Sequence, residues 1–170
     1  MRFAVKTRAH RAALLGLSVL GALAPAGLRA EKPDVHVTLV APPQLAAGTR
    51  TTVVVEMTLG GGWHVNSHAP AEKFLIPTDV NLTTTQGSLS EIRYPRHVEK
   101  RFAFADTAML VYEGTVRFEA DLTLPAGANG DMVVAGTVAF QACNERQCFA
   151  PAKLPVDAKV LVVPAPSSGR

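Results

Sequence analysis

Cysteine is scarce in this chain, with two residues among 170. Two thiols are too few for a small scaffold held by several disulfides, and too few for a metal site built from four thiolates. They leave room for one pair, and that pair is Cys143 and Cys148.

Charged residues are also few, at 18%, and aromatic residues make up 6%, whereas hydrophobic residues make up 48%. Low charge with high apolar content is typical of a globular protein and excludes a disordered chain. A length of 170 residues corresponds to one domain with a short appendage.

The apolar run of residues 12–23 is shorter than the roughly 20 residues that a membrane-spanning helix needs. Residues 1–30 contain five of the seventeen Lys and Arg residues and none of the fourteen acidic residues. A basic start, a short apolar run and small residues after it form the layout of a secretory signal peptide. We therefore expect residues 1–30 to be a signal peptide, cleaved after Ala26 or Ala30. An uncleaved membrane anchor is the alternative.

Removal of this segment changes the charge of the chain. Twelve basic and fourteen acidic residues remain, so the net charge becomes −2 instead of +3. A weakly acidic chain gives no support for nucleic-acid binding. We expect an exported protein with no nucleic-acid partner and no stable membrane insertion after cleavage.

Beyond the signal segment, short β-branched runs alternate with turns rich in Gly, Pro and Asn, and no run keeps a helical period. The expected strands are residues 35–40, 51–57, 63–65, 80–83, 109–112, 116–122, 133–140 and 156–162. Short, evenly spaced strands predict an all-β fold, an immunoglobulin-like β-sandwich of about seven to nine strands. We expect this domain to span residues 31–163, followed by a loose tail at 164–170.

The chemistry of the chain is concentrated at Cys143 and Cys148, which have four residues between them and lie between two expected strands. Cβ atoms of cross-strand neighbours lie about 4.5–5.5 Å apart, and a disulfide needs roughly 3.5–4.5 Å, so the pair can bridge after a small adjustment. So short a loop stabilises the fold by only about 2 kcal/mol. A redox-active pair, a structural staple and a metal site all remain open.

The metal alternative needs further ligands, and His64 and His68 are candidates to join the two thiols in a zinc or copper site. These imidazoles, like those of His36 and His97, are equally explained as ordinary surface or turn residues. The sequence contains no haem-attachment motif, no Gly-rich phosphate loop and no nucleophile elbow.

Several sequence blocks between Gly60 and Pro151 resemble one known family and occur in its order. The sequence Phe-Gln-Ala-Cys-Asn at 140–144, with Cys148 and Pro151 after it, resembles the active-site hairpin of the N-terminal periplasmic domain of DsbD, the thiol:disulfide interchange protein. Further blocks that resemble this domain are Gly-Trp-His-Val-Asn-Ser at 62–67, Leu-Ile-Pro-Thr at 75–78, Tyr-Pro at 94–95, Glu-Lys-Arg-Phe at 99–102 and Tyr-Glu-Gly at 112–114.

This resemblance implies an immunoglobulin-like fold and a redox-active Cys143–Cys148 pair in the periplasm. It implies a thiol-disulfide oxidoreductase linked to cytochrome c biogenesis, with no cofactor other than the disulfide. Electrons would come from a thioredoxin-like donor and pass to periplasmic disulfide proteins. In the family the second cysteine bonds to the partner, which makes Cys148 the attacking thiol and Cys143 the resolving thiol.

The family also has a cap loop, in which a Phe ring covers the pair until a partner docks. By position this loop lies within residues 94–112, and its covering ring is Phe102 or Phe104. His64 and Asn66 fall where the family has residues near the pair.

The chain also departs from the family. Four residues separate its cysteines, where the best-known members have five; Arg146 among them favours a thiolate and Glu145 opposes it, although a solvated hairpin tip explains both. The sequence ends at Arg170, without a membrane-embedded segment or a thioredoxin-like domain. We therefore expect a separate electron source, such as a membrane electron-conducting protein. The alternatives are a non-catalytic interaction domain and a copper- or zinc-handling module.

Overall fold

The computed structural model describes residues 32–166, and every regular element among them is a β-strand. The predicted signal peptide and residues 167–170 of the predicted tail lie outside the described residues. Residues 32–166 contain no helix long and apolar enough to cross a membrane. The strands are β1 (Val35–Val40), β2 (Gln44–Ala46), β3 (Arg50–Leu59), β4 (His64–Asn66), β5 (Asp79–Thr84), β6 (Ser88–Leu89), β7 (Val98–Lys100), β8 (Met109–Glu113), β9 (Thr115–Thr123), β10 (Gly130–Phe140), β11 (Ala142–Cys143) and β12 (Ala152–Val163).

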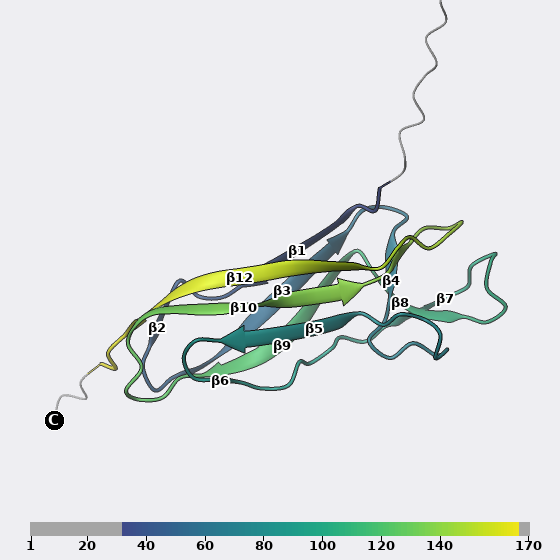
Figure 1. The fold of residues 1–170 in the computed structure, drawn as a ribbon. Helices are drawn as coiled ribbons and strands as arrows, with labels where there is room; N and C mark the ends of the chain where they lie inside the picture. The colour runs from purple at the N-terminus through teal and green to yellow at the C-terminus, as the bar shows by residue number, and fades with distance from the viewer. Residues whose placement is uncertain (1–31, 167–170) are drawn as a thin grey trace, which may run out of the picture. The chain divides into compact units, whose positions relative to one another are not determined.

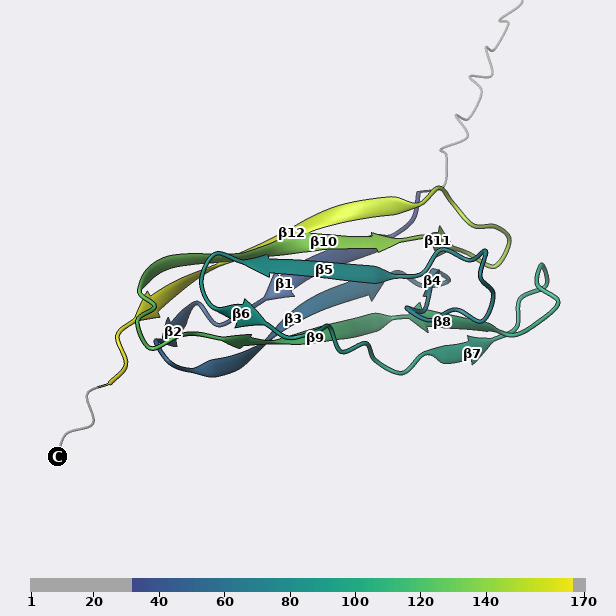
Figure 2. The same cartoon turned by 60° about the horizontal axis from the view of Figure 1, so that its bottom comes forward.

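Two four-stranded sheets form the body of the domain (Figure 1). The first sheet has the order β1-β3-β9-β6 and is antiparallel throughout. The second has the order β2-β12-β10-β5, in which only the short β2 runs parallel to its neighbour. Figure 2 shows the layer of β12, β10 and β5 lying over the layer of β3 and β9.

The core explains why these two sheets pack together. Residues of β9 alternate between buried and more exposed positions along the strand, as side chains at every second position share a face. The buried side chains of the two sheets meet in two apolar clusters, which include Val53, Val55, Met57, Phe118, Leu122, Met132, Val134, Val138, Val156 and Val160. The predicted immunoglobulin-like β-sandwich is therefore confirmed.

The observed strands differ from the predicted ones mainly where they are short. Each predicted strand overlaps an observed strand, but β2, β6, β7 and β11 have only two or three residues and show no readable alternation. Strand β12 begins at Ala152 and includes Pro155. Pro155 is compatible with the strand because β12 has paired neighbours on both sides only at Leu161 and Val162.

A third sheet, in the order β11-β4-β8-β7, lies at one end of this body (Figures 1 and 2). Only Gln141 separates β11 from β10, and only Gly114 separates β8 from β9. Val65, Tyr112 and Ala142 of this sheet are buried in the sandwich core. The core therefore fixes the position of the strand that contains Cys143.

One close contact between strands provides a test of this packing. A Cβ atom at Gly136 of β10 would overlap the carbonyl oxygen of Asn81 in β5. We expect Gly136→Ala to lower the free energy of unfolding by about 1–3 kcal/mol, the range for overpacking. Gly127→Ala is the control, because a Cβ there has no atom within 4 Å, and its effect should stay within about 0.5 kcal/mol. Urea unfolding of the oxidised protein measures both, and equal effects would contradict the close approach.

Candidate functional site

The candidate site begins with the hairpin that contains the two cysteines. Cys143 and Cys148 pair as an antiparallel bridge and form a disulfide, with Cα atoms 3.9 Å apart. The Oδ1 atom of Asn144 accepts hydrogen bonds from the backbone N–H groups of Arg146 and Gln147, each 2.9 Å long. Asn favours such turns because its side chain replaces a backbone acceptor. The four residues between the cysteines therefore form a closed turn.

The outer arm of the hairpin returns to the sheet at Phe149. Its backbone N–H donates to the carbonyl oxygen of Ala142 over 2.9 Å, and its ring lies 5.1 Å from that of Trp63. The side chain of Gln141 also donates to the carbonyl oxygen of Phe149 over 3.0 Å. These contacts hold the arm that contains Cys148.

The two cysteines differ strongly in exposure. Cys143 is 0% exposed, whereas Cys148 is exposed. Cys143 belongs to β11 inside the third sheet, while Cys148 lies on the outer arm of the hairpin. Cys148 is therefore the solvent-accessible end of the disulfide.

His64 lies beside Cys143 on one face of the third sheet. In β4, His64 pairs with Cys143 of β11 on one side and with Glu113 of β8 on the other. Directly paired residues share a face, and their Cβ atoms lie about 4.5–5.5 Å apart. The neighbouring residues Val65 and Ala142 point into the core. We call the face of Cys143, His64 and Glu113 the cysteine face.

The imidazole of His64 is buried without a polar partner. His64 is 1% exposed, and neither ring nitrogen makes a hydrogen bond within residues 32–166. Leaving a buried polar group unpaired costs about 1–3 kcal/mol, so such groups need an explanation. The ring stacks on Phe102, with centroids 4.1 Å apart and planes inclined by 17°. His64 is thus enclosed by an aromatic ring and by the strand of Cys143.

These surroundings keep His64 neutral at neutral pH. The pKa of His64 is lowered from 6.5 to about 4, first by burial and then by the Lys100 ammonium group. The carboxylates of Glu145 and Glu113 act in the opposite direction, but they do not offset the loss of hydration.

Lys100 links three parts of the site. Its Nζ atom lies 2.9 Å from Glu113 Oε2 in β8 and 3.5 Å from Glu145 Oε1 at the hairpin turn. The same atom lies 5.5 Å from the centre of the Phe102 ring. Exposed ion pairs contribute less than about 1 kcal/mol each, so this network positions the hairpin turn more than it stabilises the fold.

The loop of residues 101–108 contains both candidate covering rings, in different positions. Phe102 is 4% exposed and covers the imidazole beside Cys143. Phe104 stacks on Phe102, with centroids 5.3 Å apart, but it is 44% exposed. The loop thus places the buried Phe102 ring on His64 and leaves Phe104 near Cys148, in the wall of the same pocket.

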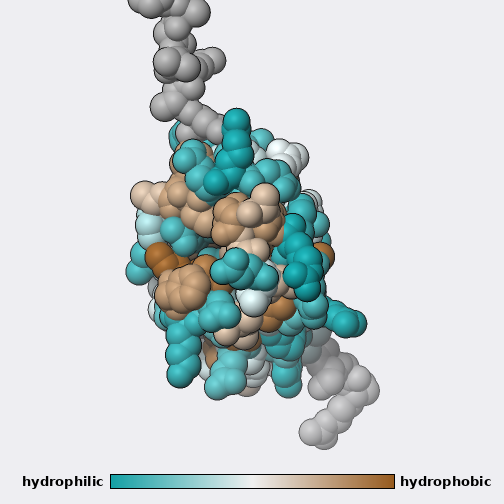
Figure 3. Space-filling model, turned by 90° about the vertical axis from the view of Figure 1, so that its right-hand side faces the viewer, coloured by the Kyte–Doolittle hydropathy of each residue, from teal (hydrophilic) through white to brown (hydrophobic). Residues whose placement is uncertain are grey.

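A pocket of about 380 Å³ opens beside Cys148. Its walls come from the 67–78 loop, with Phe74 and Leu75, and from the 101–108 loop, with Phe104. Phe74 is 80% exposed. Figure 3 views this end of the domain and shows apolar side chains gathered among polar ones. Cys148 therefore lies in the wall of a pocket on an exposed apolar surface.

Asn66 and His68 hold the 67–78 loop. Asn66 Nδ2 donates to the carbonyl oxygen of Ile76 over 2.9 Å, and its backbone oxygen accepts a 2.6 Å hydrogen bond from the hydroxyl of Thr78. His68 stacks on Tyr94, with centroids 3.6 Å apart, and its Nδ1 lies 3.1 Å from the carbonyl oxygen of Thr78. Of the histidines considered for the site, only His64 lies beside a cysteine.

The alternative metal site is not assembled in the part of the chain that the structure describes. Cys143 and Cys148 use both sulfur atoms for the disulfide, and His68 contacts Tyr94 and Thr78 instead. Within residues 32–166, no three His, Cys, Asp or Glu side chains come together in a group that could hold a metal ion.

Sequence reasoning misses several residues that complete the site. Lys100 and Glu113 stand inside blocks that carry the family resemblance, but the pattern assigns them no role. The ion pair of Lys100 with Glu145 and the row of Glu113, His64 and Cys143 depend on β7 and β11, which are too short to predict. Phe74 gives no signal except that it is an aromatic residue in a Pro-flanked segment.

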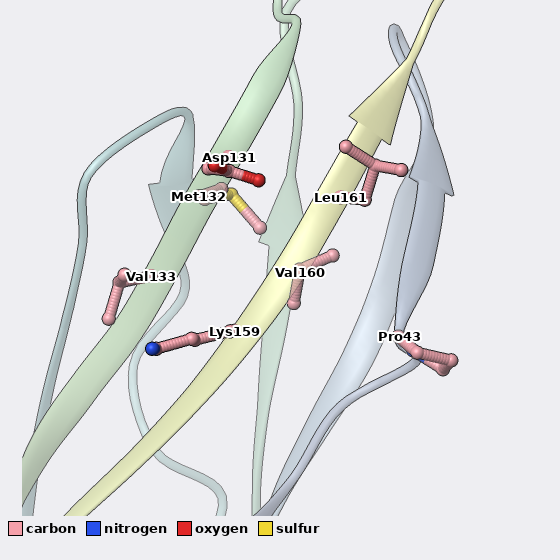
Figure 4. Close-up of a pocket in the computed structure, with 7 residues that line it drawn as sticks. All are labelled: Pro43, Asp131, Met132, Val133, Lys159, Val160 and Leu161. Atoms are coloured by element: carbon pink, nitrogen blue, oxygen red, sulfur yellow. The ribbon is translucent and has the colours of Figure 1, made fainter.

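Another pocket, of about 390 Å³, lies near the far end of the β10–β12 pair (Figure 4). Met132 pairs with Val160 there, whereas Phe140 pairs with Ala152 at the end nearest the cysteines. Asp131 and Lys159 are its charged side chains, and Figure 4 shows them on different strands. The pocket contains no thiol or imidazole, so the reactive chemistry belongs to the cysteine end.

Comparison with protein families gives one match over most of the chain. The family model described as "Thiol:disulfide interchange protein DsbD, N-terminal" matches residues 36–158, which include both cysteines. A search among curated protein sequences gave no significant match.

Three solved structures are similar to the chain at low sequence identity. The N-terminal periplasmic domain of ScsB from Proteus mirabilis is 14% identical with a TM-score of 0.43, and the alignment covers 71% of this chain but 43% of that one. The reduced N-terminal domain of DsbD from Neisseria meningitidis is 14% identical with a TM-score of 0.41, covering 68% and 82% of the two chains. A fragment of Escherichia coli alpha-2-macroglobulin is 20% identical with a TM-score of 0.45, covering 78% and 17%. The chain thus spans less than half the length of the ScsB chain.

The buried imidazole makes stability depend on pH. Because the pKa of His64 is lowered to about 4 from 6.5, the unfolded chain binds a proton first as the pH falls. The free energy of unfolding is therefore unaffected by the protonation of His64 above pH 6.5. It falls as the pH drops toward 4, by up to about 3 kcal/mol. We expect His64→Leu to remove this loss, and His36→Leu, at an exposed imidazole, to keep it. Urea unfolding of the oxidised protein between pH 7 and about pH 4 checks this; the same loss in both variants would contradict it.

Proposed function

Because the chain belongs to the family of DsbD N-terminal domains, which takes part in thiol:disulfide exchange, we propose that it relays electrons through Cys143 and Cys148. A separate thioredoxin-like donor or a membrane electron-conducting protein reduces the pair. Exported disulfide-containing proteins then take the electrons. Domains of this family are periplasmic, and we place this relay in the periplasm.

One observation carries this proposal: the disulfide is buried at one end and open at the other. Cys143 is 0% exposed, whereas Cys148 is exposed and lies in the wall of an open pocket. Disulfide exchange depends on access of the attacking thiolate to one sulfur atom. A purely structural bridge does not need this difference between its two ends.

The asymmetry assigns the two thiols different steps. In the reduced form, the Cys148 thiolate attacks one sulfur of a target disulfide and forms a mixed disulfide, and the other target sulfur leaves with the electron pair. Cys143 then attacks the sulfur of Cys148, so the intramolecular disulfide forms and the target leaves as a dithiol after protonation. Cys143 needs no access from solvent, because its substrate is the adjacent sulfur.

The surrounding side chains support this division. The buried ring of Phe102 stacks on His64, the cross-strand neighbour of Cys143, and this contact supports a covering role that would keep small thiols and water from the Cys143 side. The ammonium group of Lys100 lies at the hairpin turn and compensates the Glu145 carboxylate, which would otherwise oppose a thiolate. The pocket beside Cys148 provides room for the partner segment that contains the reacting sulfur.

Trapping with single-cysteine variants tests the assignment. Cys143→Ala should form a stable mixed disulfide with a thioredoxin-like protein that keeps one active-site cysteine, supplied as its disulfide with thionitrobenzoate. The exposed Cys148 thiolate attacks that cysteine sulfur, and thionitrobenzoate leaves with the electron pair. Cys148→Ala should form it at least about tenfold more slowly, because an accessible thiolate is required. Non-reducing electrophoresis with time measures both rates.

The control is the same reaction in urea, where both variants are unfolded and should react at similar rates. Equal trapping by the two folded variants would contradict the roles of Cys143 and Cys148. Absence of trapping by either folded variant, with normal reaction in urea, would contradict the relay itself.

A further inference from the structure

The unpaired imidazole of His64 has no role in the fold or in the relay described above. Its two nitrogens are buried and make no hydrogen bond within residues 32–166, although His64 and Cys143 are directly paired positions of adjacent strands. No carbonyl or carboxylate of the described residues approaches the ring as a hydrogen-bond acceptor. Its cross-strand neighbour Cys143 has its sulfur in the disulfide.

We propose that His64 forms a hydrogen bond with the sulfur of Cys143 only when the pair is reduced, and that this bond shifts the redox equilibrium toward the dithiol. This inference rests on the proposed redox role of the pair. In the oxidised structure the ring therefore has no hydrogen-bond partner among the described residues.

The chemistry of sulfur explains why the bond depends on the redox state. A disulfide sulfur is a weak acceptor and has no hydrogen to donate. A thiol can donate its hydrogen to the unprotonated nitrogen of a neutral imidazole, and a thiolate accepts the ring N–H as a charge-assisted hydrogen bond. Reduction therefore supplies the hydrogen-bond partner that the buried ring lacks. The thiol of Cys143 bonds to the unprotonated ring nitrogen, and its thiolate bonds to the ring N–H.

The electron and proton balance of the step is complete. A donor thiolate attacks the Cys148 sulfur, the bond between Cys148 and Cys143 breaks, and its electron pair passes to the Cys143 sulfur as a thiolate. The ring N–H of His64 binds this thiolate until the proton of the donor's second thiol reaches it. The donor's second thiolate then attacks the donor sulfur of the mixed disulfide, and Cys148 leaves as a thiolate that takes up the proton released by the donor's first thiol. The donor dithiol thus becomes a disulfide, and this pair becomes a dithiol.

The groups around His64 favour such a bond. Phe102 covers the ring, and hydrogen bonds are stronger where water is excluded. Lys100 is the cation that acts on the ring, and the carboxylates that oppose it are Glu113 and Glu145. Lys100 lies within ion-pair distance of both, and the three groups together carry a net charge of −1 (+1 − 2). This charge opposes a bare thiolate at Cys143, so a hydrogen bond to the sulfur has more to stabilise.

The redox equilibrium of substituted proteins tests the proposal. His64→Leu removes the bond of the reduced form and the unpaired group of the oxidised form, so both changes favour the disulfide. We expect the equilibrium constant for reduction by dithiothreitol to fall about tenfold, which is about 30 mV for a two-electron couple. His64→Gln keeps a donor and an acceptor and should stay within about threefold of the original chain.

His68→Leu is the matched control, because it removes an imidazole that contacts Tyr94 and Thr78 instead of the cysteines. It should leave the equilibrium constant unchanged. Equal shifts in His64→Leu and His68→Leu would overturn the proposal, and so would equal shifts in His64→Leu and His64→Gln.

A second measurement uses the unsubstituted chain and does not depend on how a variant folds. The ring ¹⁵N chemical shifts of His64 should change when the pair is reduced at neutral pH, because a new hydrogen bond forms at the ring. Unchanged shifts would overturn the proposal. If His64 responds but the trapping reaction fails, the hydrogen bond stands and the relay function fails. If trapping succeeds and His64 does not respond, only the present inference fails.

Discussion

The register of the third sheet is the constraint on which the site depends. Strands β11, β4, β8 and β7 align Cys143, His64 and Glu113 in one row on the cysteine face. The alternate residues Val65, Tyr112 and Ala142 are buried in the sandwich core. A slip of one residue would exchange these two faces and place the cysteine in the core. The apolar side chains of the sandwich therefore determine the position of the reactive sulfur, although none of them takes part in the chemistry.

This register also produces the two unlike ends of the disulfide. Cys143 is buried because it lies in a strand on a covered face. Cys148 is exposed because it lies beyond the turn, so the short hairpin joins a buried cysteine to an exposed one. The loops of residues 67–78 and 101–108 place aromatic side chains near both ends of the disulfide. Phe102 stacks on His64 beside the buried Cys143, while Phe74 and Phe104 line the pocket that Cys148 also lines. Within one disulfide, Cys148 is thus accessible to solvent and Cys143 is not.

The sequence predicts the parts of the molecule that have long-range periodicity or a distinctive spacing. The long strands β3, β9, β10 and β12 contain β-branched and apolar runs between turn residues, and the spacing of Cys143 and Cys148 indicates a cross-strand pair. Strands of two or three residues carry no such pattern, so the alignment of Lys100 and Glu113 with the hairpin cannot be read from the chain. As metal-ligand candidates, His64 and His68 are not distinguished by the sequence, although the family resemblance places His64 near the pair. Pairing with Cys143 distinguishes His64, whereas His68 contacts Tyr94.

The same limit applies to the two rings of the 101–108 loop. Phe102 and Phe104 are two residues apart in a segment without regular structure, and nothing in the sequence ranks them. Packing against β8 buries Phe102 and leaves Phe104 at the surface. A resemblance between sequences can assign a function to such a loop, but tertiary contacts decide which side chain performs it.

The reduction potential of the Cys143–Cys148 pair, measured in the purified chain by equilibration with defined thiol buffers, tests the central claim most directly. A relay that exchanges electrons with thioredoxin-like proteins should have a potential between roughly −180 and −270 mV. A value below about −300 mV is typical of structural disulfides. That result would contradict the account and would make this domain a β-sandwich held by a hairpin staple.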